Sequence, residues 1–366
     1  MTTSDIAGAA TDLLPPAFHF SDEHRALREV LRQFFGTEVG ESAEGWRRLL
    51  DEVGVDDLLF GAGESCGTAI DLAILAEEAG AALFRGPLVS TAAAGPLLAA
   101  NADSAAIVAL LRQRPRAAVS AGLIARGALG LSGDGGSRRV SGAAELVWDL
   151  DDAGPIVCAA SIEGTESIVV LNADEPGVAV TELSGLDPSR GLGRIECRGV
   201  TPELVLTDPV ALAALRRRAD LVVAAELLGV AQHAFDQTLD YVSRRIQFGR
   251  TIGSFQAIKH RLADLLTQVE LTRSAVYGAA WQLAGDPESR RTAMDLAVAA
   301  ALAADTAAAM TKAAVQLHGG IAITWEHWAH RYLRRAHSVV ALTGGAAGHR
   351  RRLAELVDLE DGERVR

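Results

Sequence analysis

Residues 244–264 read RRIQFGRTIGSFQAIKHRLAD and join two long segments in which apolar residues recur at helical spacing. The short link between the segments holds Arg245, Phe248, Gly249 and Arg250. Cationic and aromatic side chains therefore gather where the N–H groups at a helix start are free to bind an anion. This pattern indicates a site for the phosphates and rings of a nucleotide; the alternative is a basic turn that faces water.

The overall composition limits the classes of protein to which the chain can belong. With 366 residues, 49% of them hydrophobic, it can bury a large core and form more than one domain. Its net charge of −12 argues against a nucleic-acid or anionic-membrane surface. Basic residues nevertheless cluster in the last third, as at Arg216 to Arg218 and Arg350 to Arg352, where they suit either a polyanionic small molecule or solvent-facing helix ends.

Cysteine usage and the N-terminal residues indicate the cellular compartment. Cys66, Cys158 and Cys197 are too few and too widely spaced for a disulfide framework or a zinc site, so we expect core residues in a reducing compartment and no metal. The first residues show no basic segment followed by an apolar one, and apolar runs of about 18 residues occur only in alanine-rich helical pieces. We therefore expect a cytoplasmic protein that does not span a membrane.

Three regions differ in their apolar pattern and predict an α+β fold that is mainly α. Residues 1–115 have helical periodicity, with a helix start at Ser21, and predict an N-terminal α-helical domain. Residues 116–208 carry short Val/Ile-rich runs separated by Gly, Pro, Asn and Asp, which predict a small middle β domain, a barrel or a sandwich. Residues 209–366 predict a C-terminal four-helix bundle, which contains the 244–264 segment.

Individual elements are also predicted within these regions. A strongly helical apolar stretch covers 69–82, and strands are expected around 156–158, 167–171 and 203–206. The four bundle helices are expected at 211–243, 255–284, 288–318 and from 325 to the C-terminus, with a turn at Gly285-Asp286-Pro287.

The 244–264 string resembles the signature of the acyl-CoA dehydrogenase family, whose members use FAD. A second segment, AVQLHGG at 314–320, is similar to the family's Gln-x-x-Gly-Gly element, where a helix ends and bare backbone approaches the cofactor. In the family, both segments contact the ADP half of an FAD across a subunit interface. The resemblance implies the following FAD contacts: Arg245, Phe248, Ile252, Phe255, Gln256, Gln316, Gly319 and Gly320.

The catalytic base of the family has no counterpart at either of its usual places. A glutamate takes a proton from the acyl α-carbon while hydride leaves the β-carbon for the flavin, a step that suits a carboxylate whose basicity is raised by desolvation. The usual glutamate stands in Tyr-Glu-Gly-Thr, whereas this chain reads LTGG at 342–345, with Thr343 at the matching position. The second known place, on the first bundle helix, corresponds to Ala219. Neither residue can act as a base.

Two acidic residues near Ala219 are alternative candidates for the base. Asp220 is adjacent, but a shift of one residue turns a side chain by about 100° around a helix. Glu226 lies about two turns further on an apolar helix, where we expect a paired interface carboxylate. The catalytic base therefore stays unassigned.

The middle region also departs from the family pattern. The family's Thr-Glu-Pro and Gly-Ser-Asp segments, which bind flavin, pyrophosphate and acyl-CoA, are not found in 117–142. Trp148 matches either the family's tryptophan beside the isoalloxazine ring or an ordinary core tryptophan, and Arg335 stands where the family has an aspartate. The half of the site that receives the flavin ring is thus reduced, while the half that contacts ADP is kept.

This uneven pattern resembles the partner subunit of the heteromeric, α2β2 acyl-CoA dehydrogenases that actinobacteria use on bulky acyl-CoA thioesters, including steroid side chains. The resemblance implies an FAD-dependent enzyme that acts with a homologous catalytic subunit, and electron-transferring flavoprotein is the family's default acceptor. Two alternatives remain: an independent enzyme, as a homotetramer with a relocated base, and a cofactor-free scaffold or binding protein of the same fold. The sequence does not identify the acyl group, the partner or the physiological acceptor.

Overall fold

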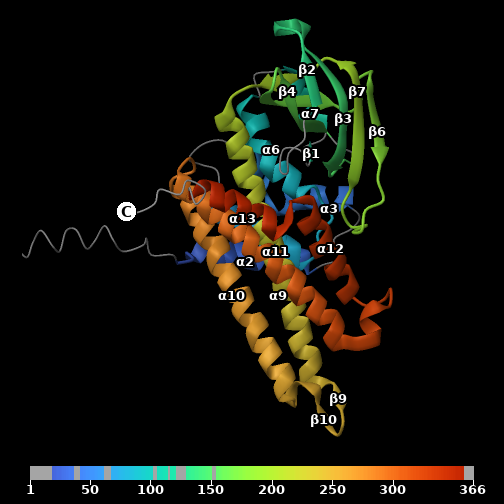
Figure 1. Ribbon diagram of the computed structural model, residues 1–366, viewed down its shortest axis with the longest axis vertical. Coiled ribbons are helices and arrows are strands. Elements are labelled where there is room, and N and C mark those ends of the chain that lie inside the picture. The colour runs from blue at the N-terminus through green and yellow to red at the C-terminus, as the bar shows by residue number, and fades with distance from the viewer. Residues whose placement is uncertain are drawn as a thin grey trace, which may run out of the picture.

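The computed structural model describes residues 19–36, 42–61, 67–101, 105–113, 116–120, 129–150 and 154–357 (Figure 1). A group of short N-terminal helices is followed by a β-sheet and then by a bundle of long helices. The predicted α+β fold that is mainly α is confirmed. Cys66 lies outside the described residues.

The N-terminal helices begin where local signals predict. The side chain of Ser21 accepts a hydrogen bond from the backbone N–H of His24 (3.2 Å), and the His24 side chain accepts one from the backbone of Ser21 (3.1 Å), which forms a capping box. Thr68 and Asp71 cap the predicted apolar helix in the same way. The helices are α2 (Asp22–Phe35), α3 (Ser42–Arg48), α4 (Asp56–Phe60), α5 (Ala69–Ala81), α6 (Leu88–Ala100) and α7 (Ala105–Gln113), with a π-helical turn at Leu49–Val53.

The middle region is an eight-stranded sheet. Its order is β6-β7-β3-β1-β4-β5-β8, and β2 also pairs with β3 and β4. The strands are β1 (Ala118–Ser120), β2 (Leu129–Ser132), β3 (Arg139–Trp148), β4 (Pro155–Ile162), β5 (Thr165–Asn172), β6 (Val178–Glu182), β7 (Leu192–Val200) and β8 (Leu204–Leu206). The predicted strands fall in β4, β5 and β8, whereas closure of the sheet into a barrel stays a prediction.

Alternate residues along the strands pack into two different hydrophobic cores. On β4, Ile156 and Cys158 point into a core within the strands, whereas Val157 and Ala159 face the opposite side. That opposite side packs against side chains of α6, α7 and the start of the first bundle helix, such as Leu215. The sheet is therefore fixed to the helical parts of the molecule along one face.

The C-terminal bundle differs from the prediction in its last segment. Its helices are α9 (Pro209–Arg244), α10 (Gln256–Gly285), α11 (Arg290–His318), α12 (Ala329–Leu342) and α13 (Gly345–Leu356). The first three match the predicted segments and the turn after Gly285. The single fourth helix was wrong, because Gly344 and Gly345 take positive φ values of 82° and 63° and break it into α12 and α13.

Helices α5 and α9 approach so closely that only glycine fits at their contact. A Cβ at Gly229 would lie 1.9 Å from the carbonyl oxygen of Glu77, and one at Gly80 would lie 2.2 Å from that of Glu226. Each helix thus has a glycine at the point where the backbone of the other helix comes closest. Around this contact, the N-terminal helices and the bundle share one hydrophobic core.

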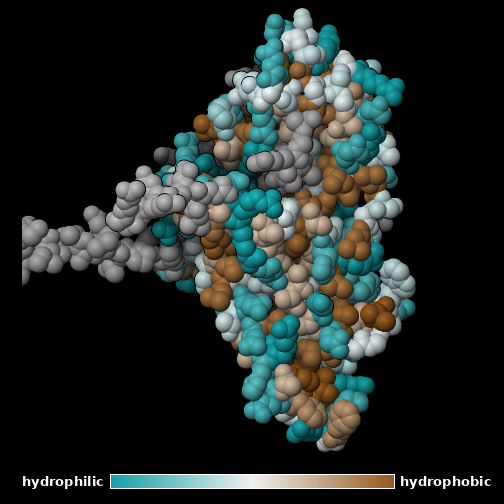
Figure 2. Space-filling view, viewed as in Figure 1, coloured by the Kyte–Doolittle hydropathy of each residue, from teal (hydrophilic) through white to brown (hydrophobic). Residues whose placement is uncertain are grey.

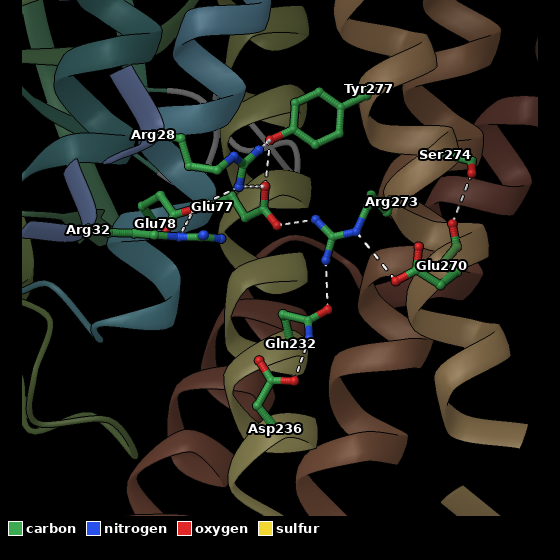
Figure 3. Close-up of polar contacts among 10 residues, drawn as sticks. All are labelled: Arg28, Arg32, Glu77, Glu78, Gln232, Asp236, Glu270, Arg273, Ser274 and Tyr277. Carbon is green, nitrogen blue, oxygen red and sulfur yellow. Dashed lines mark hydrogen bonds and ion pairs between the residues drawn. The ribbon is translucent and has the colours of Figure 1, made fainter. Parts of the chain in front are cut away.

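A polar network crosses the same junction (Figure 3). The buried carboxylate of Glu77 accepts hydrogen bonds from Arg28 (2.8 Å), Arg273 and Tyr277. Arg273 also donates to the side-chain oxygen of Gln232 on α9 (2.6 Å). These side chains come from α2, α5, α9 and α10, so the network links the N-terminal helices to the bundle.

Helix α11 with the short helix that follows it (Arg290–Ile323) is long and apolar enough to cross a membrane. No other helix in the described part of the chain meets this test. It packs against α9, α10 and α13, and 56% of its most apolar window is buried. Its apolar composition is accounted for by its place in the core of the bundle.

Candidate functional site

A two-stranded hairpin joins α9 to α10 at the lower end of the bundle (Figure 1). Strand β9 (Ile246–Gln247) pairs with β10 (Arg250–Thr251), and the turn between them has positive φ at Phe248 (55°) and Gly249 (77°). Positive φ at both central residues is the requirement of a type I′ hairpin turn. The turn holds Phe248 at the tip with 91% of the residue exposed.

Arg245 lies at the base of the hairpin, and its guanidinium group is available to bind a ligand. Its backbone N–H donates to the carbonyl of Tyr241 (2.8 Å) and ends α9, and its own carbonyl accepts from Ile252 (2.8 Å). The backbone is thus fixed, while no described residue pairs with the guanidinium. The neighbouring Arg244, by contrast, forms an ion pair with Asp240 one turn earlier.

The other predicted residues of this segment gather around Phe255. The guanidinium of Arg250 lies 3.9 Å from the centre of the Phe255 ring, a cation–π contact, and the Phe248 ring meets it edge-on at 6.1 Å. Ile252 packs against the main core, and Gln256 is exposed as the first residue of α10. Beside them, an apolar pocket of about 580 Å³ lies between α9 and α10, lined by residues that include Phe235 and Leu262.

The second predicted segment ends α11 at the same end of the bundle. The helix stops at His318, and Gly319 takes φ 69° and begins a 3₁₀ turn (η4, Gly319–Ile323). Gln316, Gly319 and Gly320 are exposed, and a Cβ built at either glycine would meet nothing within 4 Å, so a ligand can approach the backbone.

Tyr241 and His318 bring the two segments together. Their rings stack with centroids 4.2 Å apart and an interplanar angle of 24°. Tyr241 lies one helical turn before Arg245, and His318 directly precedes Gly319, so the contact fixes the hairpin relative to the end of α11. Sequence reasoning missed this pair; its signal was a tyrosine four residues before Arg245 and a histidine inside the Gly-Gly motif.

The two family positions of the base carry no carboxylate and are enclosed. Thr343 caps the end of α12, is 6% exposed, and donates its hydroxyl to the carbonyl of Val339 (2.9 Å). Ala219 is fully buried against the sheet-facing core.

Asp220 is a buried carboxylate that is already paired. Burial raises the pKa of Asp220, and the charge of Arg352, 2.8 Å from its Oδ2, acts in the opposite direction. A raised pKa suits a base, but Asp220 is only 6% exposed and does not line the pocket between α9 and α10 described above. The side chain binds α13 to α9.

Glu226 has both oxygens occupied. Arg190 donates to Oε1 and Oε2 (2.7 and 2.8 Å), and Arg335 donates to Oε1 (2.7 Å). Although burial raises the pKa of Glu226, the charges of Arg190 and Arg335 outweigh it and hold the pKa below its ordinary value. Glu226 is paired, as expected, but with residues of its own chain in the interior rather than at an interface, and the pairing leaves a poor base.

Arg335, which stands where the family has an aspartate, completes this interior network. It is 1% exposed and donates to Asp187, to Glu226 and to the hydroxyl of Ser189 (2.7 Å). The loop between β6 and β7 is thereby fastened to α9 and α12. A polar pocket of about 410 Å³ lies beside it, lined by residues 182–185 and 187–192 together with Arg85.

Comparison with known proteins identifies the family of the chain. Residues 211–357 match the model of the acyl-CoA dehydrogenase C-terminal domain. The acyl-CoA dehydrogenase IpdE2 of Mycobacterium tuberculosis is 33% identical over 341 residues, which cover 88% of this chain and 93% of that protein. The chain belongs to the acyl-CoA dehydrogenase family. It is also 32% identical to the acyl-CoA dehydrogenase FadE34 of the same organism over 97% of this chain, but spans only about half of that relative (48%).

Solved structures of the family share the fold over nearly the whole chain. A variant of the Tcur3481-Tcur3483 steroid ACAD has a TM-score of 0.81 and 25% identity, covering 93% of this chain and 98% of that chain. The ChsE4-ChsE5 complex from Mycobacterium tuberculosis has a TM-score of 0.76 and 23% identity with the same coverage.

The two halves of the described structure fit FAD, the cofactor of this family, unequally. At this end of the bundle, an unpaired guanidinium, the exposed Phe248 ring and the bare glycine backbone after α11 suit phosphates and an adenine ring. In the interior, Trp148 is fully buried, and the Arg190 guanidinium lies 5.0 Å from its ring centre. The Trp148 indole N–H and Nη1 of Arg190 lack partners, yet both atoms are shielded from solvent. These side chains offer no exposed contact for a flavin ring.

Proposed function

We propose that this chain is a subunit of an FAD-dependent acyl-CoA dehydrogenase that contributes the ADP-side contacts to an FAD held mainly by a homologous catalytic chain. One observation carries the proposal. The ADP-side residues Arg245 and Phe248 are exposed on a hairpin, whereas none of the four described positions weighed for the base offers an unpaired, accessible carboxylate.

The chemistry divides between the two chains. FAD, when bound, accepts the hydride of α,β-dehydrogenation. The guanidinium of Arg245 binds pyrophosphate oxygens through charge-assisted hydrogen bonds. The aromatic rings of Phe248 and Phe255 contact the adenine, with Ile252 and Gln256 beside them, and the segment around Gln316 to Gly320 offers backbone to the adenosine.

Similar proteins support a paired arrangement and a bulky substrate. The Tcur3481-Tcur3483 protein bears a double name and is called a steroid ACAD, and ChsE4-ChsE5 is a complex. The relative FadE34 is about twice as long as this chain, so it has room for two units of this size in one polypeptide. We propose an acyl-CoA thioester with a bulky or steroid-derived acyl group as substrate, an α2β2 assembly, and electron-transferring flavoprotein as acceptor.

Expression of the chain alone and together with the product of the neighbouring gene, if that product is a catalytic acyl-CoA dehydrogenase chain, tests the proposal. The flavin content per chain is read from the visible absorbance of the purified protein, and turnover from formation of enoyl-CoA. We expect weak flavin occupancy alone, and stoichiometric flavin with activity only in the pair. Full flavin and turnover by the lone chain would favour the independent enzyme, whereas absence of flavin from both preparations would favour a cofactor-free scaffold.

Arg245→Ala should weaken FAD retention in the complex. The change removes a charge-assisted contact to pyrophosphate, which contributes about 1.5–3 kcal/mol, a loss of roughly 10- to 150-fold in FAD affinity. FAD release is followed by fluorescence during dilution. Arg244→Ala is the matched control, because its side chain pairs with Asp240 and its removal changes the net charge equally. Equal FAD affinity in the two variants would contradict the role of Arg245.

The independent enzyme is the second candidate, since burial raises the pKa of Asp220 as a base requires. Asp220→Asn separates the two functions. In the proposed heteromer this variant keeps its turnover number, because the base lies in the partner. A loss of about 100-fold or more would assign general-base catalysis to Asp220.

A further inference from the structure

The most exposed large apolar side chains of the described residues gather on two segments. Phe248 (91%) and Ile246 (62%) belong to the hairpin, and Trp325 (78%) and Ile323 (73%) follow the end of α11. Stacking of Tyr241 on His318 holds the two segments at one end of the bundle. In Figure 1 the hairpin and the link from α11 to α12 both project from the lower half of the molecule, and Figure 2 shows hydrophobic side chains on that half of the surface.

The segment after α11 turns its apolar residues outward. Ala322 is fully buried, while Ile321 (53% exposed), Ile323 and Trp325 on either side of it face solvent. We call these three residues the Trp325 surface. Side chains of this size contribute nothing to the core when exposed, and a cluster of them on a soluble face marks an interaction site.

The Trp325 ring is nonetheless held in one place. His330 meets it edge-on with centroids 5.5 Å apart, and the guanidinium of Arg334 lies 5.3 Å from its centre. Arg334 is itself anchored, since its Nε donates to the carbonyl of Leu186 (2.7 Å). Thr324 closes the turn by donating its hydroxyl to the Ile321 carbonyl (2.9 Å). A partner therefore meets an already ordered tryptophan, which lowers the entropic cost of association.

We infer that the Trp325 surface docks against the homologous catalytic chain and that Trp325 is its anchor. This inference rests on the proposed function. The occupant follows from continuity of the backbone: Gly319 and Gly320 are proposed to lie against the FAD held by that chain, and Ile321 comes directly after Gly320. A protein that receives the two glycines meets the apolar turn within a few residues. Tryptophan with a neighbouring arginine is also the residue pattern of interface hot spots.

Trp325→Ala tests the inference in the complex of this chain with the catalytic chain. The probe is the catalytic chain labelled with a fluorophore and titrated with this chain at saturating FAD, so that pairing rather than flavin loading is measured. We expect Kd to rise about 30-fold or more, as for truncation of an interface hot spot. Val30→Ala on α2 removes another exposed apolar side chain (48% exposed) and should leave Kd unchanged.

A second variant and a stability measurement keep the result unambiguous. Ile323→Asp should weaken pairing at least as strongly, because it places a charge in an apolar contact. Both variants should keep the melting temperature of the lone chain, since the altered side chains are exposed. Unchanged Kd for both would overturn the inference and leave the proposed function intact, provided that wild-type pairs bind flavin. Self-association of the lone chain that is lost in Trp325→Ala would also overturn it, because the occupant would then be a second copy.

Discussion

At the scale of single residues, the interior of the chain is organised by Arg335. Its guanidinium is nearly inaccessible and bonds to two buried carboxylates, Glu226 and Asp187. Removing one partner of a buried ion pair is far more costly than the pair is stabilising, because it leaves charge without compensation. Arg335 is therefore a residue of the fold rather than of the chemistry.

Arg335→Met should lower the free energy of unfolding by about 3–5 kcal/mol at pH 7, since methionine fills part of the volume but leaves the buried Asp187 without a counter-charge and Glu226 with Arg190 alone. Urea unfolding followed by circular dichroism measures the change. Arg331→Met, on the exposed side of the same helix, is the matched control and should change stability by less than about 0.5 kcal/mol. A similar effect of the two substitutions would show that the network contributes little.

The loss in Arg335→Met should also depend on pH with a definite sign. Burial raises the pKa of both Glu226 and Asp187, but the arginines outweigh it and hold each pKa below its ordinary value. Such groups contribute stability above their unfolded pKa of about 4 and lose it as the pH falls through the folded pKa. Without Arg335 the carboxyls protonate more readily, so the difference from wild type should be smaller at pH 4 than at pH 7.

The role of a single residue could be predicted only where it follows from residues nearby in the sequence. The helix start at Ser21 and the exposed hairpin arginine come from local pattern, and the expectation that Glu226 is paired comes from its place on an apolar helix. Its partners could not be predicted, because Arg190 lies 36 positions and Arg335 lies 109 positions away in the sequence. The absence of a carboxylate at Thr343 and Ala219 could be read directly from the sequence. That these positions are buried became visible only in the three-dimensional structure.

At the scale of helices and strands, the contact between α5 and α9 has the least tolerance for change. Gly229→Ala should destabilise the chain by about 3 kcal/mol or more, because the new methyl group would lie 1.9 Å from the Glu77 carbonyl and the two backbones cannot yield. Thermal unfolding measures the effect. Gly278→Ala on α10 is the control, since its Cβ would meet nothing within 4 Å, and it should stabilise by about 0.5–1 kcal/mol.

Long elements were predicted well and short ones were not. Helices α9, α10 and α11 have many turns of apolar periodicity, so their existence and rough limits followed from the sequence. The hairpin strands are two residues long, too short to show an alternation, and the Phe-Gly turn is less diagnostic than Asn-Gly. The break between α12 and α13 was missed although Gly344-Gly345 was visible, because apolar periodicity resumes on both sides.

At the scale of the whole molecule, the two helical regions form one body. Their side chains share a core, and Glu77 ties α2 to α10 (Figure 3). The predicted division at 115 and 208 describes the order of elements along the chain. Because the core is common, we propose that the N-terminal helices do not fold without the bundle.

Calorimetry of wild type and of Glu77→Gln tests this unity. The helical regions should unfold in one transition, which Glu77→Gln moves to lower temperature as a whole. The loss should lie toward the lower end of about 3–5 kcal/mol, because Arg28 and Arg273 are partly exposed and water compensates them in part. Two separate transitions, with only one of them moved by the substitution, would show that the regions are independent.

The burial of Thr343 bears on what catalysis by this chain alone would require. Its side chain is nearly inaccessible, and its hydroxyl is turned back onto α12, where it donates to the Val339 carbonyl. A glutamate placed at this position would have to fit a longer, charged side chain where threonine is buried. Under the proposed function, self-sufficient catalysis would therefore require more than the return of one glutamate, and the chain would depend on its companion for turnover.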